Sequence, residues 1–485
     1  MTQDYVEGVA YPPQFHREMT PPWIDAVLRG LGRQGPDFAR PFRWCELGCG
    51  SGLNALILAA THPQAEVVAV DADASALAEA RIAADAAALR NIVFLPLRFD
   101  QLRAGSLGFF DVIATHGVLS WIAPAQRSAM LNLIGAALRP GGVAYAHYMT
   151  HPGMSAAAAG QSLMLRYAAG QPGAARHRAR ASLNIMQSLA DAGAGYFAAY
   201  PQERQRLQWA ARQEDAALAH EVLPPNWQPF HVAEMMEAFA GSGCAYLGSA
   251  TPPDNIDAVS LPAATRPLLA GVEDAALAES LRDMARNQSL RRDLYGKELA
   301  PMSADAHRTA LHALRLAGLP GAPEAGRLRF DLPLGQVEGE AALFDPLLRA
   351  LRNRPRRLGE MERPGLHPAM LNQAAQMLIW SECAHPVAAA PAPPQAAWAL
   401  NRHLATRGGA GWLAAPALGG AVAADPAAML GARIALEEPG LDDVALVERA
   451  AHLLDTEQSA SRDLLADWAQ KRRQVWVNFG VLPAA

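Results

Sequence analysis

The sequence predicts an α/β fold, with a doubly wound parallel sheet near the N-terminus followed by mainly helical α+β regions. Two observations support this class. Short apolar runs alternate with helical stretches between residues 42 and 148, as buried parallel strands linked by crossover helices do. A glycine-rich turn, GCGSG at 48–52, joins the first run to the first helical stretch, and glycine there lets a ligand approach the backbone closely.

Five strands are expected in chain order. Their sequences are FRWCEL, EVVAV, NIVFL, FDVIAT and GVAYAHY. Helices are expected between them at 54–60, 75–89 and 124–138, where the apolar residues take helical spacing. The RPGG sequence at 139–142 is expected to form a turn that ends the last of these helices before the fifth strand.

The pattern becomes mainly helical beyond residue 152. Residues 155–220 are rich in Ala and Arg, with glycine-containing breaks at 170–173 and 193–195. A Pro-rich segment at 223–229 then separates this stretch from the rest of the chain.

After the Pro-rich segment, the pattern predicts a helix at 232–240, a strand at 245–248 and further helix through Arg292. From about residue 301, helices with short strands are expected. These changes divide the chain into regions that we expect to pack as separate bodies. The regions are a glycine-rich domain over 1–165, a helical linker region over 166–221, a further domain over 222–300 and a mainly helical C-terminal domain over 301–485.

Composition excludes several classes of protein. Apolar residues make up 51% of the chain and charged residues 18%, which is incompatible with intrinsic disorder. The net charge of −5 argues against a nucleic-acid partner, since such proteins usually carry a basic surface. Four scattered cysteines without a CxxC pair indicate neither a disulfide framework nor a metal site.

No membrane partner is expected either. The first residues lack the basic-then-apolar order of a signal peptide. The longest uncharged apolar stretch, 412–424, is too short to span a bilayer. The sequence therefore predicts a soluble, cytoplasmic protein and indicates no particular oligomeric state.

The residues around the glycine-rich turn distinguish between two kinds of cofactor. A dinucleotide fingerprint needs G-x-G-x-x-G, with a small residue at the sixth position, but Leu53 stands there. Glu46, two residues before Gly48, would be awkward beside a pyrophosphate and suits a cationic ligand. S-adenosylmethionine, with its ammonium and sulfonium, is such a ligand.

Two more acids follow the next strands. Asp71 ends the second strand, where a carboxylate can accept both hydroxyls of a ribose. Asp100 follows the third strand in the sequence RFD and could hold the amino group of adenine. Acids at three successive strand ends would line the edge at which open α/β sheets bind ligands.

Together these motifs resemble a class I S-adenosylmethionine-dependent methyltransferase, whose catalytic domain is Rossmann-like. The resemblance covers residues 42–148 and rests on ELGCGSG, AVDAD, RFD, FDVIATHGVLSW and LRPGG. It implies an enzyme that uses S-adenosylmethionine. The alternative is a Rossmann-like domain that has lost its ligand.

The resemblance also implies the cofactor contacts. The glycines of the turn would surround the methionine part, Asp71 the ribose and Asp100 the adenine, and the loop 115–117 would pass near the methyl group. Tyr11 belongs to an aromatic segment that could cover the cofactor or pack outside the sheet, and could reach the cofactor carboxylate. The expected contacts are Tyr11, Glu46, Gly48, Cys49, Gly50, Gly52, Asn54, Asp71, Ala72, Phe99, Asp100, Thr115, His116 and Gly117.

A narrower resemblance extends over about residues 1–300. The segments THGVLSWI, HYMTHPGM, HEVLPPNWQPF, FAGSGCAYLGSA and LRDMARNQSLRRDLYGK are similar to a bacterial group that carries a methyltransferase regulatory domain after the catalytic domain. That group includes the rickettsial protein-lysine methyltransferases. This sequence departs from the pattern at Met149 and Met154, where Asn and Trp are expected, and the departure leaves the acceptor class open.

Candidates for catalysis follow the fourth and fifth strands. His116 is a candidate base or cofactor contact, with a structural loop histidine as the alternative. His147 and Tyr148 end the fifth strand, and because side chains alternate along a strand only one can face the ligand edge. Tyr148 is the one we expect there, with simple packing as the alternative.

The leading function is methyl transfer to an amine of a protein, such as a lysine, or of a peptide. One alternative is an N- or O-methyltransferase that acts on a small natural product, and another is a non-catalytic cofactor-binding interaction protein. The long region beyond the catalytic domain suits a large acceptor, and we expect it to form part of the acceptor site. The intact glycines and Asp71 speak against a non-catalytic role.

Overall fold

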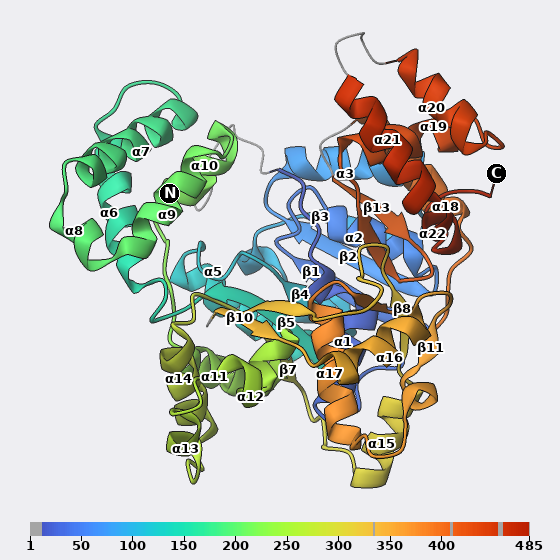
Figure 1. Cartoon of the computed structure of the whole chain (residues 1–485). Coiled ribbons are helices and arrows are strands. Elements are labelled where there is room, and N and C mark those ends of the chain that lie inside the picture. Colours follow the sequence, from blue (N-terminus) through green and yellow to red (C-terminus); the bar gives the residue numbers. More distant parts are fainter. Residues whose placement is uncertain (1–11, 333–334, 408–410, 454–458, 485) are drawn as a thin grey trace.

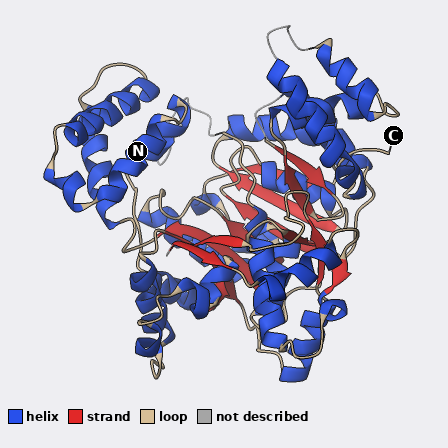
Figure 2. Ribbon diagram, viewed as in Figure 1, coloured by secondary structure: helices blue, strands red, loops and turns tan. Residues whose placement is uncertain are grey.

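A computed structural model gives the fold of the chain and describes residues 12–332, 335–407, 411–453 and 459–484. One seven-stranded sheet lies at its centre, in the order β3-β2-β1-β4-β5-β7-β6 (Figure 1, Figure 2). The first five strands are parallel, and β7 and β6 run antiparallel to their neighbours. The strands are β1 (Phe42–Leu47), β2 (Ala65–Asp71), β3 (Ile92–Pro96), β4 (Phe110–Thr115), β5 (Leu138–Met149), β6 (Ala245–Ser249) and β7 (Leu290–Gly296).

Helices cover both faces of this sheet and bury a separate apolar cluster on each, which confirms the predicted doubly wound α/β class. Every residue of the second helix is buried, so its uninterrupted apolar sequence is compatible with a helix. The third helix begins at an N-cap, Asp73, whose carboxylate accepts the N–H groups of Ser75 and Ala76. The covering helices are α1 (Pro21–Gly30), α2 (Leu53–Thr61) and α3 (Ala74–Ala86) on one face, and α5 (Pro124–Ala137) and α11 (Val232–Gly241) on the other; the short α4 (Ala104–Leu107) precedes β4.

The RPGG sequence does not form the separate turn that we predicted. It lies in the first part of β5, which already begins at Leu138. The pairing of β5 with β4 shifts between Phe110 and Val112, so the irregular residues are accommodated within the strand.

The prediction of helix through Arg292 is wrong, and so is the expectation that the region after residue 222 packs as a separate body. Residues 290–296 form β7, which pairs with β5 along seven positions from Val143 to Met149. The strand period was obscured because the alternate residues Arg291 and Asp293 are charged yet buried, in an ion network described below. Consequently β7 and β6 extend the catalytic sheet.

Five helices between β5 and the Pro-rich segment form a bundle with its own apolar core, drawn in green in Figure 1. The glycine-containing breaks fall between helices, as the sequence predicts. The chain enters and leaves the bundle at neighbouring points, since Thr150 and Phe230 form a β-bridge. The helices are α6 (Ser155–Ala169), α7 (Ala175–Asp191), α8 (Gly195–Ala199), α9 (Pro201–Ala211) and α10 (Asp215–Val222).

The chain between β6 and β7 forms three α-helices, and the described part of the remaining chain is mainly helical with three small sheets. The helices before β7 are α12 (Asp257–Ser260), α13 (Arg266–Leu269) and α14 (Ala275–Arg286). The later helices are α15 (Ala304–Ala313), α16 (Ala341–Leu351), α17 (Pro368–Trp380), α18 (Gln395–Arg407), α19 (Pro426–Glu437), α20 (Asp443–Ala451), α21 (Ser459–Lys471) and α22 (Arg473–Asn478). The small sheets consist of β11 (Arg356–Arg357), β8 (Arg315–Gly318) and β12 (Ala384–Pro386); β9 (Arg329–Leu332) and β10 (Gly335–Glu338); and β13 (Trp412–Ala415) and β14 (Gly420–Ala423).

The C-terminal region is packed firmly against the catalytic sheet. Helix α17 contacts α1, and α18 contacts α2 and α3. One apolar cluster runs from α1 and α2 into residues 311–421, so the two parts share a core. Within the described ranges, none of the helices has the length and apolar character needed to cross a membrane.

Candidate active site

The predicted acids lie at one edge of the sheet, where the parallel strands end. Glu46 is the penultimate residue of β1, Asp71 ends β2 and Asp100 follows β3 in a short 3-10 helix, η2 (Phe99–Gln101). Carboxyl ends of adjacent parallel strands meet at the same edge, and open α/β sheets bind their ligands there. The structure therefore places all three acids at the expected position.

The glycine-rich loop after β1 is fixed on one side and open on the other. The N–H groups of Gly48 and Cys49 donate to the Val70 carbonyl at 2.8 and 3.0 Å, which ties the loop to β2. Gly48 has φ +77°, and a Cβ there would stand 2.3 Å from Cγ2 of Val118. Gly50 has φ +53° and no atom within 4 Å of such a Cβ. Gly48 is thus needed for packing, whereas Gly50 leaves space for a ligand.

Asp71 is positioned by the same loop. It is 4% exposed, and its two oxygens accept the N–H groups of Gly50 at 2.8 Å and of Asp73 at 2.9 Å. Burial raises the pKa of this carboxyl. Each carboxylate oxygen can accept a second hydrogen bond, so Asp71 can hold the loop and still bind ribose hydroxyls. The loop contact was not anticipated from the sequence.

Glu46 is buried with an unsatisfied oxygen. It is 6% exposed, and its Oε2 has no hydrogen-bond partner within the described part of the chain. Burial and the charge of Asp71 raise its pKa to about 8, although a hydrogen bond from the Ala55 backbone opposes the rise. A cation placed beside this carboxyl would satisfy it. The loop and the two acids therefore fit a cationic ligand such as S-adenosylmethionine.

The residues expected to contact adenine lie at the ends of β2 and β3. Ala72 is partly exposed beside Asp71, and Phe99 is buried among apolar side chains. The side chain of Asp100 is half exposed and pairs with Arg98 at 3.4 Å. Asp100 therefore retains an open carboxylate at this edge, as a contact to an amino group requires.

Three further expected contacts are largely enclosed. Gly52 is the N-cap of α2, with φ +71°. Cys49 is buried, and burial raises the pKa of its thiol well above the usual value, so this cysteine is not a reactive thiolate. The hydroxyl of Thr115, at the end of β4, is buried without a hydrogen-bond partner in the described ranges.

Asn54 holds the N-terminal segment rather than presenting a free amide. Its Oδ1 accepts the backbone N–H of His16 and its Nδ2 donates to the carbonyl of His16, both at 2.9 Å. The preceding Phe15 packs on Trp412 of β13, with ring centroids 5.2 Å apart. The segment therefore lies between the glycine loop and the C-terminal region. Tyr11, expected to contact the cofactor, lies outside the described residues.

Three histidine rings form a stack at the ends of β4 and β5. The rings of His16 and His116 lie 3.4 Å apart and 10° from parallel, and those of His116 and His147 lie 4.0 Å apart and 4° from parallel. No group of three or more His, Cys, Asp or Glu side chains in the described ranges could hold a metal ion. The stack is instead a set of imidazoles, of which the sequence reasoning favoured only His116.

Burial keeps the stacked rings uncharged. It lowers the pKa of His16 to about 4 and the pKa values of His116 and His147 well below the usual histidine value. The charge of Arg292 lowers all three pKa values further, while the charge of Glu18 opposes the shift of His16. Gly117, exposed next to the stack, has φ +66°, and a Cβ added there would have no atom within 4 Å. Neutral imidazoles thus border an open part of the edge.

The placement of Tyr148 at the ligand edge is a wrong prediction. Tyr148 is 1% exposed, and its hydroxyl donates to Asp293 Oδ2 at 2.5 Å on the opposite face of the sheet. Alternation along β5 instead turns His147 toward His116. The choice between His147 and Tyr148 depended on which element packs beside β5. That element is β7, and its buried Asp293 accepts the hydrogen bond that holds Tyr148.

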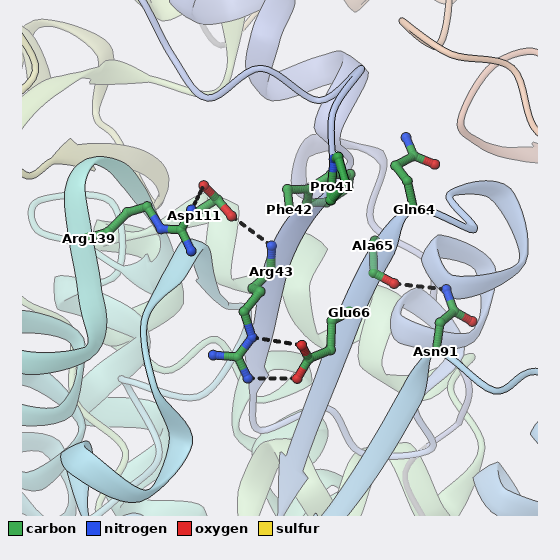
Figure 3. Close-up of a pocket in the computed structure, with 9 residues that line it drawn as sticks. All are labelled: Pro41, Phe42, Arg43, Gln64, Ala65, Glu66, Asn91, Asp111 and Arg139. Carbon is green, nitrogen blue, oxygen red and sulfur yellow. Dashed lines mark hydrogen bonds and ion pairs between the residues drawn. The ribbon is translucent and has the colours of Figure 1, made fainter.

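One pocket of roughly 310 Å³ lies at the opposite edge of the sheet, around the starts of β1 and β2 (Figure 3). Its charged side chains pair with each other. Arg43 binds Glu66 at 2.7 Å, and Arg139 binds Asp111 at 2.8 Å. These ion pairs satisfy one another, and the pocket lies far from the carboxyl ends of the strands. It is therefore not a candidate active site.

Comparison with protein families matches two parts of the chain. A model described as "Methyltransferase domain" matches residues 45–144, and one described as "Predicted methyltransferase regulatory domain" matches residues 214–297. The uncharacterized protein sll1526 of Synechocystis sp. is 32% identical over 378 residues, which are 78% of this chain and 74% of that protein. The uncharacterized protein RP789 of Rickettsia prowazekii is 27% identical over 255 residues, which are 51% of this chain and 45% of that protein.

Solved structures include one that is similar over nearly the whole chain. PKMT2 from Rickettsia typhi in complex with AdoHcy aligns with 97% of this chain and 99% of its own, with a TM-score of 0.73 and 18% identity. The shared fold therefore includes the helical bundle and the C-terminal region as well as the sheet.

Proposed function

Because the chain belongs to the S-adenosylmethionine-dependent methyltransferases that carry a methyltransferase regulatory domain, we propose that it methylates an amine, the side chain of a lysine in a protein or peptide. When bound, the cofactor supplies a methyl group on a sulfonium. Gly48, Gly50 and Glu46 would hold its methionine part, Asp71 its ribose and Asp100 its adenine.

Cofactor binding is expected to release a proton from Glu46. The pKa of Glu46 is about 8, so the carboxyl is mostly protonated at pH 7, and a cation beside it lowers that pKa. Titration calorimetry with S-adenosylmethionine at pH 7, in two buffers of different ionisation enthalpy, should report release of up to about one proton. The raised pKa also means that the apo protein loses stability as pH rises from the ordinary glutamate value toward 8.

Glu46→Gln supplies the control for this measurement. It keeps the size of the side chain and should abolish the buffer dependence of the binding enthalpy. Equal enthalpies for the parent protein in both buffers would contradict the assignment of Glu46 to the cationic part of the cofactor.

The observation that carries the choice of an amine is the neutral imidazole stack beside Gly117. An amine is protonated in water at neutral pH and must lose a proton before it can attack a methyl group. The burial that keeps these imidazoles uncharged also disfavours an ammonium beside them, and a neutral imidazole can accept a hydrogen bond from the N–H of the uncharged amine. Carboxylate and thiolate acceptors have no such N–H. The stack at the end of β4 and β5 therefore supports an amine acceptor.

Two features support a macromolecular acceptor. The bundle α6–α10 has an apolar core of its own. It reaches the edge of the sheet proposed to bind the cofactor, because the charge of His220 in α10 affects the pKa of Asp73 there. Burial opposes the effect, but hydrogen bonds from Ser75 and Ala76 and the charge of His220 together lower the pKa of Asp73. PKMT2 from Rickettsia typhi shares this architecture along 97% of the chain. A structure of this extent around one edge suits docking of a polypeptide.

The test is to incubate the protein with a bacterial protein extract and S-adenosylmethionine labelled on the methyl group. We expect label in protein, recovered after acid hydrolysis as methylated lysine. Asp71→Ala, which removes the ribose contact, gives the background. Label confined to small molecules would favour a natural-product acceptor, and label on carboxylates or hydroxyls would contradict an amine.

A further inference from the structure

Helix α17 is followed by a residue whose type is unusual for its backbone conformation. Glu382, two residues after the helix, has φ +59°, in the left-handed region that favours glycine. Its N–H donates to the carbonyl of Ile379 at 3.4 Å, and the N–H of Cys383 donates to the carbonyl of Leu378 at 3.1 Å. These two bonds form the Schellman arrangement, in which glycine usually takes the left-handed position. A glutamate there strains the backbone and adds nothing to the end of the helix.

The side chain of Glu382 binds the N-terminal segment instead. Its Oε1 lies 3.0 Å from Nη1 of Arg17. Nη2 of the same guanidinium donates to the carbonyl of Trp380 at 2.9 Å. Trp380 is the last residue of α17, and the last carbonyls of a helix have no donor within the helix. One guanidinium therefore binds both the end of α17 and the strained glutamate that follows it.

Arg17 is a mostly buried cation that needs a carboxylate. Its side chain is 17% exposed, and its guanidinium lies 4.6 Å from the centroid of the Trp23 ring. Burial lowers the pKa of Arg17, while the charges of Glu18 and Glu382 oppose that effect. Glu18 is 3.9 Å from Arg17 and also pairs with Arg292 at 3.7 Å. Removing Glu382 would thus leave Arg17 with a more distant carboxylate that it shares with a second cation.

The segment that Arg17 belongs to lies across two loops at the proposed cofactor site. The amide of Asn54, in the first turn of α2 after the glycine-rich loop, binds both backbone polar groups of His16. The ring of His16 stacks on that of His116, in the loop after β4. Arg17 then joins this segment to Trp380, 363 residues later in the chain. The end of α17 is therefore connected to both loops through three successive contacts.

We propose that Glu382 is a positioning residue for cofactor binding, which through Arg17 holds the N-terminal segment against the glycine-rich loop and the loop after β4. Glycine would suit the backbone at this position better, but it has no side chain to bind Arg17. The proposal rests on the placement of S-adenosylmethionine proposed above and is independent of the acceptor. It gives the C-terminal region a part in cofactor binding.

The test compares Glu382→Gly with the full-length parent protein. Glycine relieves the backbone but removes the carboxylate, so stability and cofactor affinity should separate. The midpoint of urea unfolding should stay the same or rise. The affinity for AdoHcy, measured by calorimetry, should fall roughly fivefold, which corresponds to about 1 kcal/mol for a partly exposed pair. The KM for S-adenosylmethionine should rise by a similar factor, with a smaller change in kcat.

Glu298→Gly is the matched control. Glu298 follows β7, has φ +54° and is exposed, and the described residues offer it no ion pair. This variant relieves a left-handed glutamate in the same way, so its affinity for AdoHcy should equal that of the parent. Trypsin gives a second readout, since an N-terminal segment that opens more often is cut more readily. Cleavage after Arg17, followed by mass spectrometry, should be faster in Glu382→Gly than in Glu298→Gly, and AdoHcy should slow it.

Three further outcomes decide the proposal. Arg17→Met should weaken AdoHcy binding at least as much, and adding Glu382→Gly to it should cause little further loss, because both remove one contact. Equal AdoHcy affinities for Glu382→Gly and Glu298→Gly, or a fall in the unfolding midpoint of Glu382→Gly along with its affinity, would overturn the role of Glu382. Asp71→Ala tests the cofactor placement separately, and parent-like AdoHcy binding by that variant would overturn the placement itself.

Discussion

Replacing Arg291 by methionine is expected to lower the free energy of unfolding by about 3–5 kcal/mol. The Arg291 side chain is 3% exposed and binds three carboxylates, those of Asp293, Asp283 and Glu279, at 2.9, 2.5 and 2.9 Å. Removing one partner from a buried ion pair leaves the other charge unpaired in a medium of low dielectric constant. Here three carboxylates would lose their shared cation at once.

The network joins β5, which begins within the residues matched by the methyltransferase-domain model, to residues matched by the regulatory-domain model. Arg291 and Asp293 belong to β7, and Asp283 belongs to α14. The hydroxyl of Tyr148, in β5, donates to Asp293, and Arg291 donates to the hydroxyl of Tyr246 in β6 at 2.9 Å. Breaking this ion network should therefore weaken the packing of β7, β6 and α14 against β5.

The loss of stability caused by Arg291→Met should grow with pH. Burial raises the pKa of Asp283 to about 7, although the charge of Arg291 opposes the rise. A carboxyl whose folded pKa is raised binds its proton more tightly in the folded state, so its contribution to stability falls as pH rises from its unfolded value toward 7. Without Arg291 the rise in the pKa of Asp283 is unopposed. The variant should therefore lose most stability above pH 7.

Urea unfolding of Arg291→Met at about pH 5.5 and about pH 8 measures this difference. Arg433→Met is the control, since the Arg433 side chain is 39% exposed and pairs with Glu437 in α19, outside the network. A pair so exposed contributes no more than about 1 kcal/mol. A loss for Arg291→Met that is equally small, or independent of pH, would contradict the role assigned to the network.

The placement of the glycine-rich loop and the acids at one edge of the sheet could be predicted because its signals are local. Gly48, Gly50 and Glu46 lie within five residues of one another, at a strand–turn–helix junction whose geometry follows from the sequence. Asp71 ends the next strand, and parallel strands bring such ends to one edge regardless of what surrounds them. Each of these sequence patterns can therefore be interpreted before the tertiary structure is known.

The arrangement of the histidine stack depends on contacts between distant parts of the chain, and these could not be predicted. His16 stacks on His116 because Asn54, 38 residues along the chain, binds its backbone. The sequence offers one clue, a polar Asn in a helix that is apolar from there to its last residue, Thr61, but it does not identify the residue that this Asn binds. Likewise, the orientation of Tyr148 follows from Asp293 in a strand that joins the sheet 145 residues later.

A fragment that ends near residue 165 is expected not to fold, whereas a protein lacking only the bundle α6–α10 should fold and bind AdoHcy. The fragment loses β7, which pairs with β5 and contributes the fully buried Leu294 and Tyr295 to the two faces of the core. Loss of one such side chain costs roughly 2–5 kcal/mol. Two of them approach the total stability of a domain, about 5–15 kcal/mol.

The bundle can be removed because it is an insertion with its own core. Its ends lie close together, since Gln161 of α6 donates to the carbonyls of Val222 and Pro224 at 2.9 and 3.1 Å. A short Gly/Ser linker can therefore join residue 154 to residue 225 without moving β5. We expect a single cooperative thermal transition and an affinity for AdoHcy close to that of the full chain.

Methyl transfer separates the two possible roles of the bundle. If α6–α10 docks the acceptor, its removal should lower transfer to a bacterial protein extract by about tenfold or more, equivalent to roughly 1.4 kcal/mol of docking energy. Transfer to a free amine such as lysine, which needs no docking surface, should fall much less. A bundle-deleted protein that methylates the extract at the full rate would show that the acceptor docks elsewhere, with the C-terminal region next to Phe15 as the remaining wall of the site. A folded, AdoHcy-binding 1–165 fragment would show that β7 is dispensable and that the catalytic domain ends where the sequence alone placed its boundary.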